Sequence, residues 1–389
     1  MKIAIDARWI FAETSGIGQH TRQLIRGLSA LKTPHEWLLL FDDPARMEEV
    51  TAETGCAWET ALLPYGLFSV RNQLQLFGHL RKAGVQVYHS TNYMMPLLPF
   101  PRFRPGAIRG VITIHDLIPL LFRDHAPRSR KNQFFPVYRQ LMIEVAARAD
   151  AIITVSQASK NDILEHLRLP ERAKDKIHVV YNGIDPKFRP DAGVLRKHPP
   201  EILYVGRLDP YKNVPQLIGA FGECRRQLPE GTRLRLIGPP DARYPEAMDL
   251  ARKLELFPYL DWEGHVDDAT LLEAYRRAAV VVLASAYEGF GLPVAEAMAC
   301  GTPVICSRAS SLPEVGGDAA VYVQPGDLHG LAQALTDLMQ DKDTRRRLAA
   351  AGPAQVKRFT MDAMARETLR VYASLHPDTH HPPDQETPV

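Results

Sequence analysis

The sequence predicts an α/β protein built from two doubly wound, Rossmann-like domains that face each other across a cleft. Its 389 residues exceed one ordinary core and indicate about two domains, at roughly 150 residues per domain. Short β-rich runs alternate with helical patterns in both halves, which is typical of parallel sheets covered by helices on both faces. A proline-rich segment separates the halves.

The expected strands are apolar runs of five to seven residues, all followed by segments with helical spacing. In the first half they are KIAID, WLLLF, VQVYHS, GVITIHD and AIITVS, and in the second half EILYVG, RLRLIG, VVVLAS, TPVICS and AAVYV. Apolar faces at helical spacing are formed by Ile17, Thr21, Leu24, Ile25 and Leu28 in the first half, and by Leu217, Ile218, Phe221 and Leu228 in the second.

These patterns divide the chain into five segments. Residues 1–186 form the first domain, 187–200 a linker, and 201–358 the second domain. A helix is expected over 359–375, and the polar, proline-rich end, residues 376–389, is expected to be disordered.

Composition excludes several classes of protein. Apolar residues make up 45% of the chain and the net charge is +2, which is ordinary for a globular protein and gives no reason to expect a nucleic-acid partner. The cysteines (Cys56, Cys224, Cys300 and Cys306) lack metal-ligand spacing, and the opening MKIAIDARWI shows no leader, so we expect a reducing, cytoplasmic setting. No window is apolar enough to span a membrane, so membrane contact would be peripheral.

A basic, aromatic stretch between Phe100 and Arg139 suits such a peripheral contact. Arg128, Arg130 and Lys131 immediately precede Phe134 and Phe135, which favours docking on an anionic membrane surface. Alternatively, the apolar members pack on the sheet and leave the arginines as a solvated edge; that set is Phe134, Tyr138, Leu141, Met142 and Val145.

Doubly wound sheets bind ligands outside the carboxyl ends of their strands, so polar groups at those positions are candidate ligand contacts. After the strand at 280–284, Glu288 and Glu296 bracket a turn that contains Gly289 and Gly291. Carboxylates accept hydrogen bonds from sugar or ribose hydroxyls, and the following helix offers N–H groups to an anion. Alternatively, Glu296 is a first-turn carboxylate favoured by the helix dipole and Glu288 is a solvated loop residue.

The strand that ends at Gly206 is followed by Arg207 and Lys212 within one loop. Two cations opposite a glycine turn and a helix N-terminus make a receptor for a diphosphate, and such a pair could replace a metal ion. Ordinary surface charge is the alternative. Like Glu296, Lys212 is expected outside the core, so substitution there should leave the fold intact.

Two further strand ends carry weaker signals. Gly16 and Gly18 are expected to precede the first helix, without the third glycine of a dinucleotide fingerprint, and a simple helix-entry turn is the alternative. His115 and Asp116 end an apolar strand, where polar groups need partners or a function. A structurally satisfied histidine is the alternative. His89 and Asn92 form a similar strand end.

Together the stretches SGIGQHT, TIHDL, ADAIITVSQASKNDI, VVYNGID, YVGRLDPYKN and YEGFGLPVAEAMACGTPVI resemble the retaining glycosyltransferases of the GT-B fold, family four. The resemblance implies that Glu288 lies near the donor sugar and Glu296 holds the ribose. It implies that Arg207 and Lys212 bind the diphosphate, and that His115 lies beside the transferred sugar. Further substrate contacts are implied at Gly16, Gly18, Asp116, Phe290, Gly291 and Leu292, and near the base at Val266. The helix at 359–375 would cross back to the first domain.

The implied reaction is transfer of a hexose from a nucleotide diphosphate sugar to a hydroxyl of a glycan or polyprenol-linked acceptor. Bacterial mannosyltransferases that use GDP-mannose in polysaccharide or lipopolysaccharide assembly are the most similar group. The one Asp-x-Asp of the sequence, Asp341-Lys342-Asp343, does not follow an expected strand, so we expect no metal and no cofactor. UDP-sugar or GDP-rhamnose donors, a nucleotide-sugar epimerase and a non-enzymatic two-lobed sugar-binding protein remain alternatives.

Overall fold

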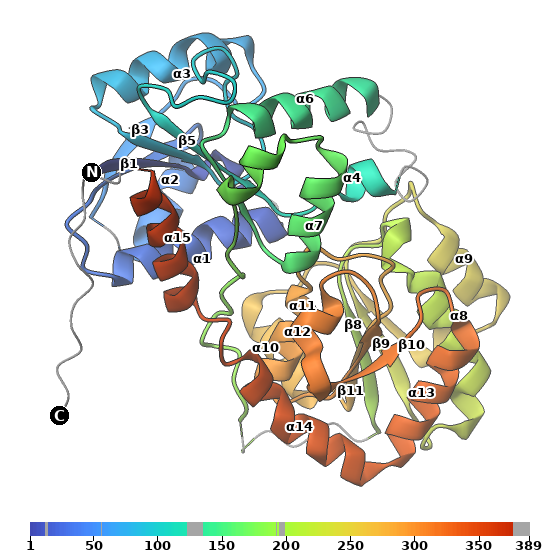
Figure 1. Cartoon of the computed structure of the whole chain (residues 1–389). Coiled ribbons are helices and arrows are strands. Elements are labelled where there is room, and N and C mark those ends of the chain that lie inside the picture. The colour runs from blue at the N-terminus through green and yellow to red at the C-terminus, as the bar shows by residue number, and fades with distance from the viewer. Residues whose placement is uncertain (12–14, 56, 123–134, 192, 194–198, 376–389) are drawn as a thin grey trace.

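The computed structural model of the chain describes residues 1–11, 15–55, 57–122, 135–191, 193 and 199–375. Across these residues it contains a seven-stranded sheet of order β3-β2-β1-β4-β5-β6-β7 and a six-stranded sheet of order β10-β9-β8-β11-β12-β13. Every strand pairing within them is parallel. Helices cover both sheets (Figure 1), so the predicted pair of Rossmann-like domains is confirmed.

The first sheet and its helices follow the expected alternation. Its strands are β1 (Lys2–Asp6), β2 (Glu36–Phe41), β3 (Glu59–Leu62), β4 (Val87–Ser90), β5 (Arg109–Ile114), β6 (Ala151–Thr154) and β7 (Ile177–Val179). Its helices are α1 (Gly16–Ala30), α2 (Pro44–Thr54), α3 (Val70–Lys82), α4 (Ile118–Leu121), α6 (Phe135–Arg148) and α7 (Gln157–His166). Short 3₁₀ turns lie at Ala7–Trp9 and Glu171–Lys176.

The second sheet is built in the same way. Its strands are β8 (Glu201–Val205), β9 (Arg233–Ile237), β10 (Leu260–Glu263), β11 (Val280–Leu283), β12 (Val304–Ser307) and β13 (Ala320–Val323). Its helices are α8 (Val214–Cys224), α9 (Glu246–Lys253), α10 (Asp268–Arg277), α11 (Leu292–Ala299), α12 (Leu312–Gly316), α13 (Leu328–Gln340) and α14 (Lys342–Val356). The 3₁₀ turns are Pro210–Lys212, Arg225–Gln227, Phe257–Tyr259 and Gly317–Ala319. Leu228 therefore lies beyond α8, although its spacing predicted a place on that helix.

The chain returns to the first domain through α15 (Met361–Ser374), which Thr360 caps. This helix packs along α1 (Figure 1), as the expected crossover does. The contact is close because Gly27 of α1 has no side chain: a Cβ there would lie 2.5 Å from the Met361 carbonyl oxygen. At the junction, Ile184 N–H donates to the Phe359 carbonyl, 2.8 Å away. The linker that we propose at 187–200 lies between β7 and β8.

Part of the predicted docking stretch is core. Phe100, Tyr138, Met142 and Val145 are buried in the first domain, so the packing alternative holds for them and they cannot enter a lipid surface. Arg128, Arg130, Lys131 and Phe134 lie outside the described residues, as do Cys56 and the tail from residue 376. In the part of the chain that the structure describes, no helix is long and apolar enough to cross a bilayer.

Candidate active site

The two domains meet where strands of both sheets end. His115 follows β5 of the first domain, and its carbonyl oxygen would lie 2.6 Å from a Cβ on Gly289, which follows β11 of the second. Ser159 of α7 donates to the same His115 carbonyl at 3.0 Å and contacts the Gly289 carbonyl at 3.4 Å. Only glycine allows this backbone approach, and it brings the predicted residues of both domains to one place.

Lys212 and Glu288 form a buried ion pair between the β8 and β11 loops. Lys212 Nζ lies 2.7 and 2.9 Å from the two Glu288 carboxylate oxygens, and Ser285 Oγ donates to Oε1 at 2.6 Å. Burial would lower the pKa of Lys212, but the adjacent Glu288 carboxylate outweighs it, so the pKa is raised and the ammonium stays charged. Lys212 lies in the 3₁₀ turn after β8 and is partly buried, with 13% of its side chain exposed.

Hydrogen bonds to backbone carbonyls hold together the two loops that carry Lys212 and Glu288. Ala286 N–H donates to the Tyr211 carbonyl at 2.7 Å, and the Asn213 side chain donates to the Ala284 carbonyl at 3.0 Å. Pro210 begins the 3₁₀ turn, and Asn213 ends it in the left-handed region. The loop after β8 is therefore fastened to the loop after β11.

Arg207 lies on the rim of the same loop instead of beside Lys212. Its side chain is 67% exposed, and Nε lies 3.0 Å from Asp209 Oδ2. The predicted pair of cations is thus one buried ammonium and one exposed guanidinium, whose long side chain has room to turn toward a ligand.

Glu296 lies inside α11 and is buried, so both its expected first-turn position and its expected place outside the core are wrong. Helix α11 begins at Leu292 because Gly291, with φ of 98°, starts the helix in the left-handed region. Tyr275 of α10 donates to Glu296 Oε2 at 2.9 Å. Burial raises the pKa of Glu296 to about 7, and the tyrosine hydrogen bond only partly offsets it.

The turn between the two glutamates is held by serines. Ser310 Oγ accepts from Glu288 N–H at 2.7 Å, and Ser311 Oγ donates to the Glu288 and Phe290 carbonyls, both at 2.9 Å. The Phe290 ring packs edge-on against Phe359, so only its backbone remains for a substrate contact. Leu292 is partly buried against the same core.

His115 is a neutral imidazole. Nε2 lies 3.0 Å from the Thr91 carbonyl, which can only accept, so Nε2 carries the proton. Burial lowers the pKa of His115 to about 4. Asp116 accepts from Ile118 N–H at 3.0 Å, and its Cβ lies near Gly289.

His20, on α1, was not identified from the sequence. Its ring lies edge-on to His115 with centroids 4.7 Å apart, and its Nδ1 lies 2.7 Å from the Asn182 Oδ1 atom. Burial and the neighbouring His115 lower its pKa to about 3. The only signal was its place two residues after Gly18 in SGIGQHT.

Gly16 and Gly18 lie in the first turn of α1, not before it. The helix starts early because Ser15 caps it, accepting from Gly18 N–H at 3.1 Å. Val266 is partly buried in the loop between β10 and α10. His89 is buried behind the site and bonds Tyr372 of α15 at 2.6 Å and Thr113 at 2.9 Å, so it is a satisfied structural residue.

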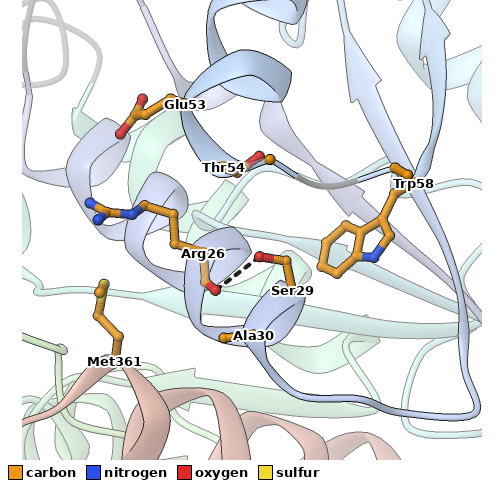
Figure 2. A pocket seen from close by; sticks show the side chains of 9 residues that line it. Arg26, Ser29, Ala30, Glu53, Thr54, Trp58 and Met361 are labelled. Atoms are coloured by element: carbon orange, nitrogen blue, oxygen red, sulfur yellow. Dashed lines mark hydrogen bonds between the residues drawn. The ribbon is translucent and has the colours of Figure 1, made fainter.

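A pocket of about 650 Å³ lies elsewhere, at the far end of α1 between α2 and α15 (Figure 2). Its charged groups are already paired, Arg26 with Asp185 at 2.6 Å and Glu53 with Arg22. It is separate from the candidate site. Among the described residues, no group of three or more His, Cys, Asp or Glu side chains is arranged to hold a metal ion.

Comparison with solved structures identifies the fold. The structure of Anabaena HepE in complex with UDP-glucose superimposes with a TM-score of 0.74 at 16% identity, over 96% of this chain and 100% of that one. The two-domain architecture is therefore the GT-B fold.

Family models then give the family. One described as Glycosyltransferase Family 4 matches residues 14–188, and one described as Glycosyl transferases group 1 matches residues 187–355. The O-antigen chain mannosyltransferase B of Escherichia coli is 28% identical over 403 residues, covering 96% of this chain and all of that relative. A glycogen synthase of Mycobacterium tuberculosis is 37% identical over 58% of this chain, which spans about half (54%) of that relative. Together the two models span residues 14–355, and the chain is a family-four-like glycosyltransferase.

Proposed function

We propose that the protein transfers mannose from GDP-mannose, with retention of configuration, to a hydroxyl of a glycan or lipid-linked oligosaccharide in bacterial polysaccharide or lipopolysaccharide assembly. The observation that carries the chemistry is the buried Lys212–Glu288 pair between the β8 and β11 loops. The choice of mannose is supported by the E. coli O-antigen chain mannosyltransferase, which matches along its whole length.

The departing diphosphate is where charge accumulates during transfer. Lys212 would exchange the Glu288 carboxylate for phosphate oxygens, and Arg207 would turn from the rim to supply forked donors. The N-terminus of α11 contributes N–H groups and the positive end of its dipole. Fixed charges of this kind stabilise the transition state without reorganisation during the reaction.

Glu288 and Glu296 would bind hydroxyl groups of the donor. Once Lys212 moves to the phosphates, Glu288 is released to accept from the sugar, while Ser285 keeps its carboxylate oriented. Glu296, behind the α11 N-terminus, would accept from the ribose. His115, being neutral, contributes a hydrogen bond beside the sugar and no charge.

Retention follows if the acceptor attacks the face that the diphosphate leaves. The acceptor oxygen forms a bond to the anomeric carbon as the bond from that carbon to the phosphate oxygen breaks. The hydroxyl proton passes to the departing diphosphate, whose negative charge rises as it leaves. The step balances without a covalent enzyme intermediate and without a metal ion.

A donor panel tests the proposal. Thermal-shift measurements with GDP-, UDP-, dTDP- and ADP-sugars should show the largest stabilisation with GDP-mannose, because ligands that bind only the folded state raise its melting temperature. A larger shift with UDP-glucose would instead assign the second candidate donor, which the HepE complex favours.

Transfer with the preferred donor should persist in EDTA. Activity that disappears with the chelator and returns with magnesium or manganese would contradict the role given to Arg207 and Lys212. In the same assay, net epimerisation of the donor without transfer to any acceptor would assign the epimerase alternative.

We also propose that the acceptor is presented at the cytoplasmic face of a membrane, where the first domain docks peripherally. The basic residues of the 100–139 stretch that the structure describes support this: Arg102 is 49% exposed and Arg104 is exposed beside it. Its buried aromatic residues do not.

A further inference from the structure

Large apolar side chains are exposed in one region of the first domain. Val70 and Leu98 are each 74% exposed, Leu74 66%, Phe68 61% and Phe11 48%. Single exposed apolar residues are ordinary, but a contiguous group indicates a surface that another phase or molecule covers.

Contacts with Trp9 and Gln73 bring the five residues to one region around the first half of α3. Val70 and Leu74 lie one turn apart on α3, and Phe68 precedes Ser69, the N-cap of that helix. Phe68 and Phe11 both contact the Trp9 ring edge-on, with centroids 5.7 and 6.0 Å apart. Leu97, next to Leu98, donates its N–H to Gln73 of α3 at 2.8 Å. We call Phe11, Phe68, Val70, Leu74 and Leu98 the α3 apolar belt.

The chain segment that carries most of the belt has basic residues and no acidic ones. Between Glu59 and Asp116 the sequence contains no acidic residue and six basic ones, Arg71, Arg81, Lys82, Arg102, Arg104 and Arg109. Arg71, Arg81 and Lys82 are exposed on α3 itself. Arg102 remains 49% exposed although Glu144 lies 3.5 Å away. A helix with apolar and basic exposed residues and no acidic ones suits an anionic lipid interface.

We propose that the α3 apolar belt, with the basic residues around it, is the surface on which the protein docks on an anionic membrane. This deepens the proposed function and rests on it, since a lipid-linked acceptor needs such a dock. It also moves the docking surface from the segment around Arg128 and Lys131, predicted from the sequence, to α3 and the β4–β5 connection.

The position of α3 fits this role. Helices α3 and α6 pack on the same face of the first sheet, through Leu76 and Leu80 of α3 and Met142 and Val145 of α6. That face lies on the side of the first domain away from the second domain (Figure 1). Helix α3 follows β3 after the connection at residues 63–69. A membrane on this side leaves the second domain clear to bind its donor.

Vesicle flotation tests the proposal on the full chain. The protein should bind vesicles of phosphatidylcholine with one-fifth phosphatidylglycerol, and bind less as salt rises. The variant Val70→Ser/Leu74→Ser/Leu98→Ser should lose affinity by about tenfold or more, because it removes the side chains that enter the interface. Arg71→Ser/Arg104→Ser should lose about fivefold per cation.

The matched control is Leu254→Ser/Phe257→Ser, which removes exposed apolar side chains (42% and 41%) from the second domain and should bind as the wild type does. Three results would contradict the proposal that the α3 apolar belt docks on an anionic membrane: equal binding to neutral vesicles, no binding to anionic vesicles at low salt, or unchanged binding by the triple variant. So would a solution oligomer that the triple variant dissociates, because the partner would then be a second copy.

Transfer to a water-soluble acceptor separates the two proposals. Vesicle binding without mannose transfer would contradict the proposed function but not the docking surface. Mannose transfer without vesicle binding would contradict the docking surface but not the proposed function.

Discussion

At the scale of single residues, the site depends on charges that are buried in pairs. Lys212 and Glu288 have side chains 13% and 9% exposed, and each neutralises the other. A buried charge that loses its partner is costly, whereas two neutral groups of similar shape are tolerated. We therefore expect Lys212 to contribute to stability as well as to the proposed catalysis, whereas the sequence predicted that its substitution would leave the fold intact.

We expect Lys212→Met/Glu288→Gln to fold and to lose about 2.7 to 4 kcal/mol of transition-state stabilisation, a fall in kcat/KM of a hundredfold or more. Lys212→Ala alone should also destabilise the fold by about 3 to 5 kcal/mol, because it leaves Glu288 buried and unpaired. Steady-state kinetics and denaturant unfolding measure the two effects, and Lys357→Ala, on the exposed surface, is the control. A correctly folded double variant with near wild-type turnover would remove these residues from the site.

Glu296 should make stability depend on pH. Its folded pKa, about 7, lies above the ordinary value of 4.5, so the folded state holds the proton more tightly than the unfolded state does. The unfolding free energy therefore falls as pH rises between about 4.5 and 7, and the deficit is complete above 7. Glu296→Gln cannot ionise and lacks this dependence. The melting temperature of Glu296→Gln minus that of the wild type should therefore increase from pH 5 to pH 8. A difference that stays constant over this range would contradict the raised pKa of Glu296.

At the scale of secondary-structure elements, the N-terminus of α7 joins the two domains. Gln157 N–H lies 3.0 Å from both carboxylate oxygens of Glu314, which belongs to α12. Tyr181 donates to the same carboxylate at 2.6 Å. A carboxylate at a helix N-terminus is favoured by the dipole, so this contact stabilises the approach of the domains.

Glu314→Ala should weaken domain closure by about 1 to 2 kcal/mol, since it removes the dipole interaction and the accepted hydrogen bonds. We expect a larger radius of gyration in small-angle scattering and a five- to thirtyfold lower kcat. Asp318→Ala, an exposed carboxylate nearby, is the control. An unchanged scattering curve together with wild-type kcat would show that Glu314 does not hold the closed form.

The elements also show where sequence patterns fail. The ten expected strands are all present, whereas β3, β7 and β10 were not expected. All three lie at sheet edges. An edge strand is covered less completely than a central one, so it needs no continuous apolar run, and ETAL and LDWE lack one.

At the scale of the whole molecule, the approach of the two domains depends on Gly289. The nearest atom to a Cβ at this position belongs to the other domain, the His115 carbonyl oxygen at 2.6 Å, a distance that real Cβ contacts do not reach. A side chain there would push the domains apart without disturbing either core.

Gly289→Ala should therefore lower kcat at least tenfold while leaving the thermal unfolding of the protein nearly unchanged. Gly264→Ala is the matched control, since a Cβ at Gly264 meets no atom within 4 Å. Kinetics with calorimetry on both variants check this. Normal turnover by Gly289→Ala would mean that the reaction does not need the close approach of these two loops.

The sequence by itself determined the fold class, the strands of both sheet centres, the crossover helix and the strand ends at which the candidate residues lie. These are local properties: buried parallel strands need apolar runs, and ligand loops need glycine and polar residues at the carboxyl ends. The residues at those strand ends also carry the resemblance to family-four glycosyltransferases, which the comparisons confirm.

Only the tertiary structure decided which groups meet. The pairing of Lys212 with Glu288, the burial of Glu296 against Tyr275 and the contact of His20 with His115 join residues 21 to 95 positions apart. Helical spacing offered the burial of Tyr138 as one of two alternatives. The burial of Phe100 and the exposure of the α3 apolar belt had no signal in the sequence, because buried and exposed apolar residues have the same identities. Burial and proximity depend on how separate elements pack, and no local pattern encodes that.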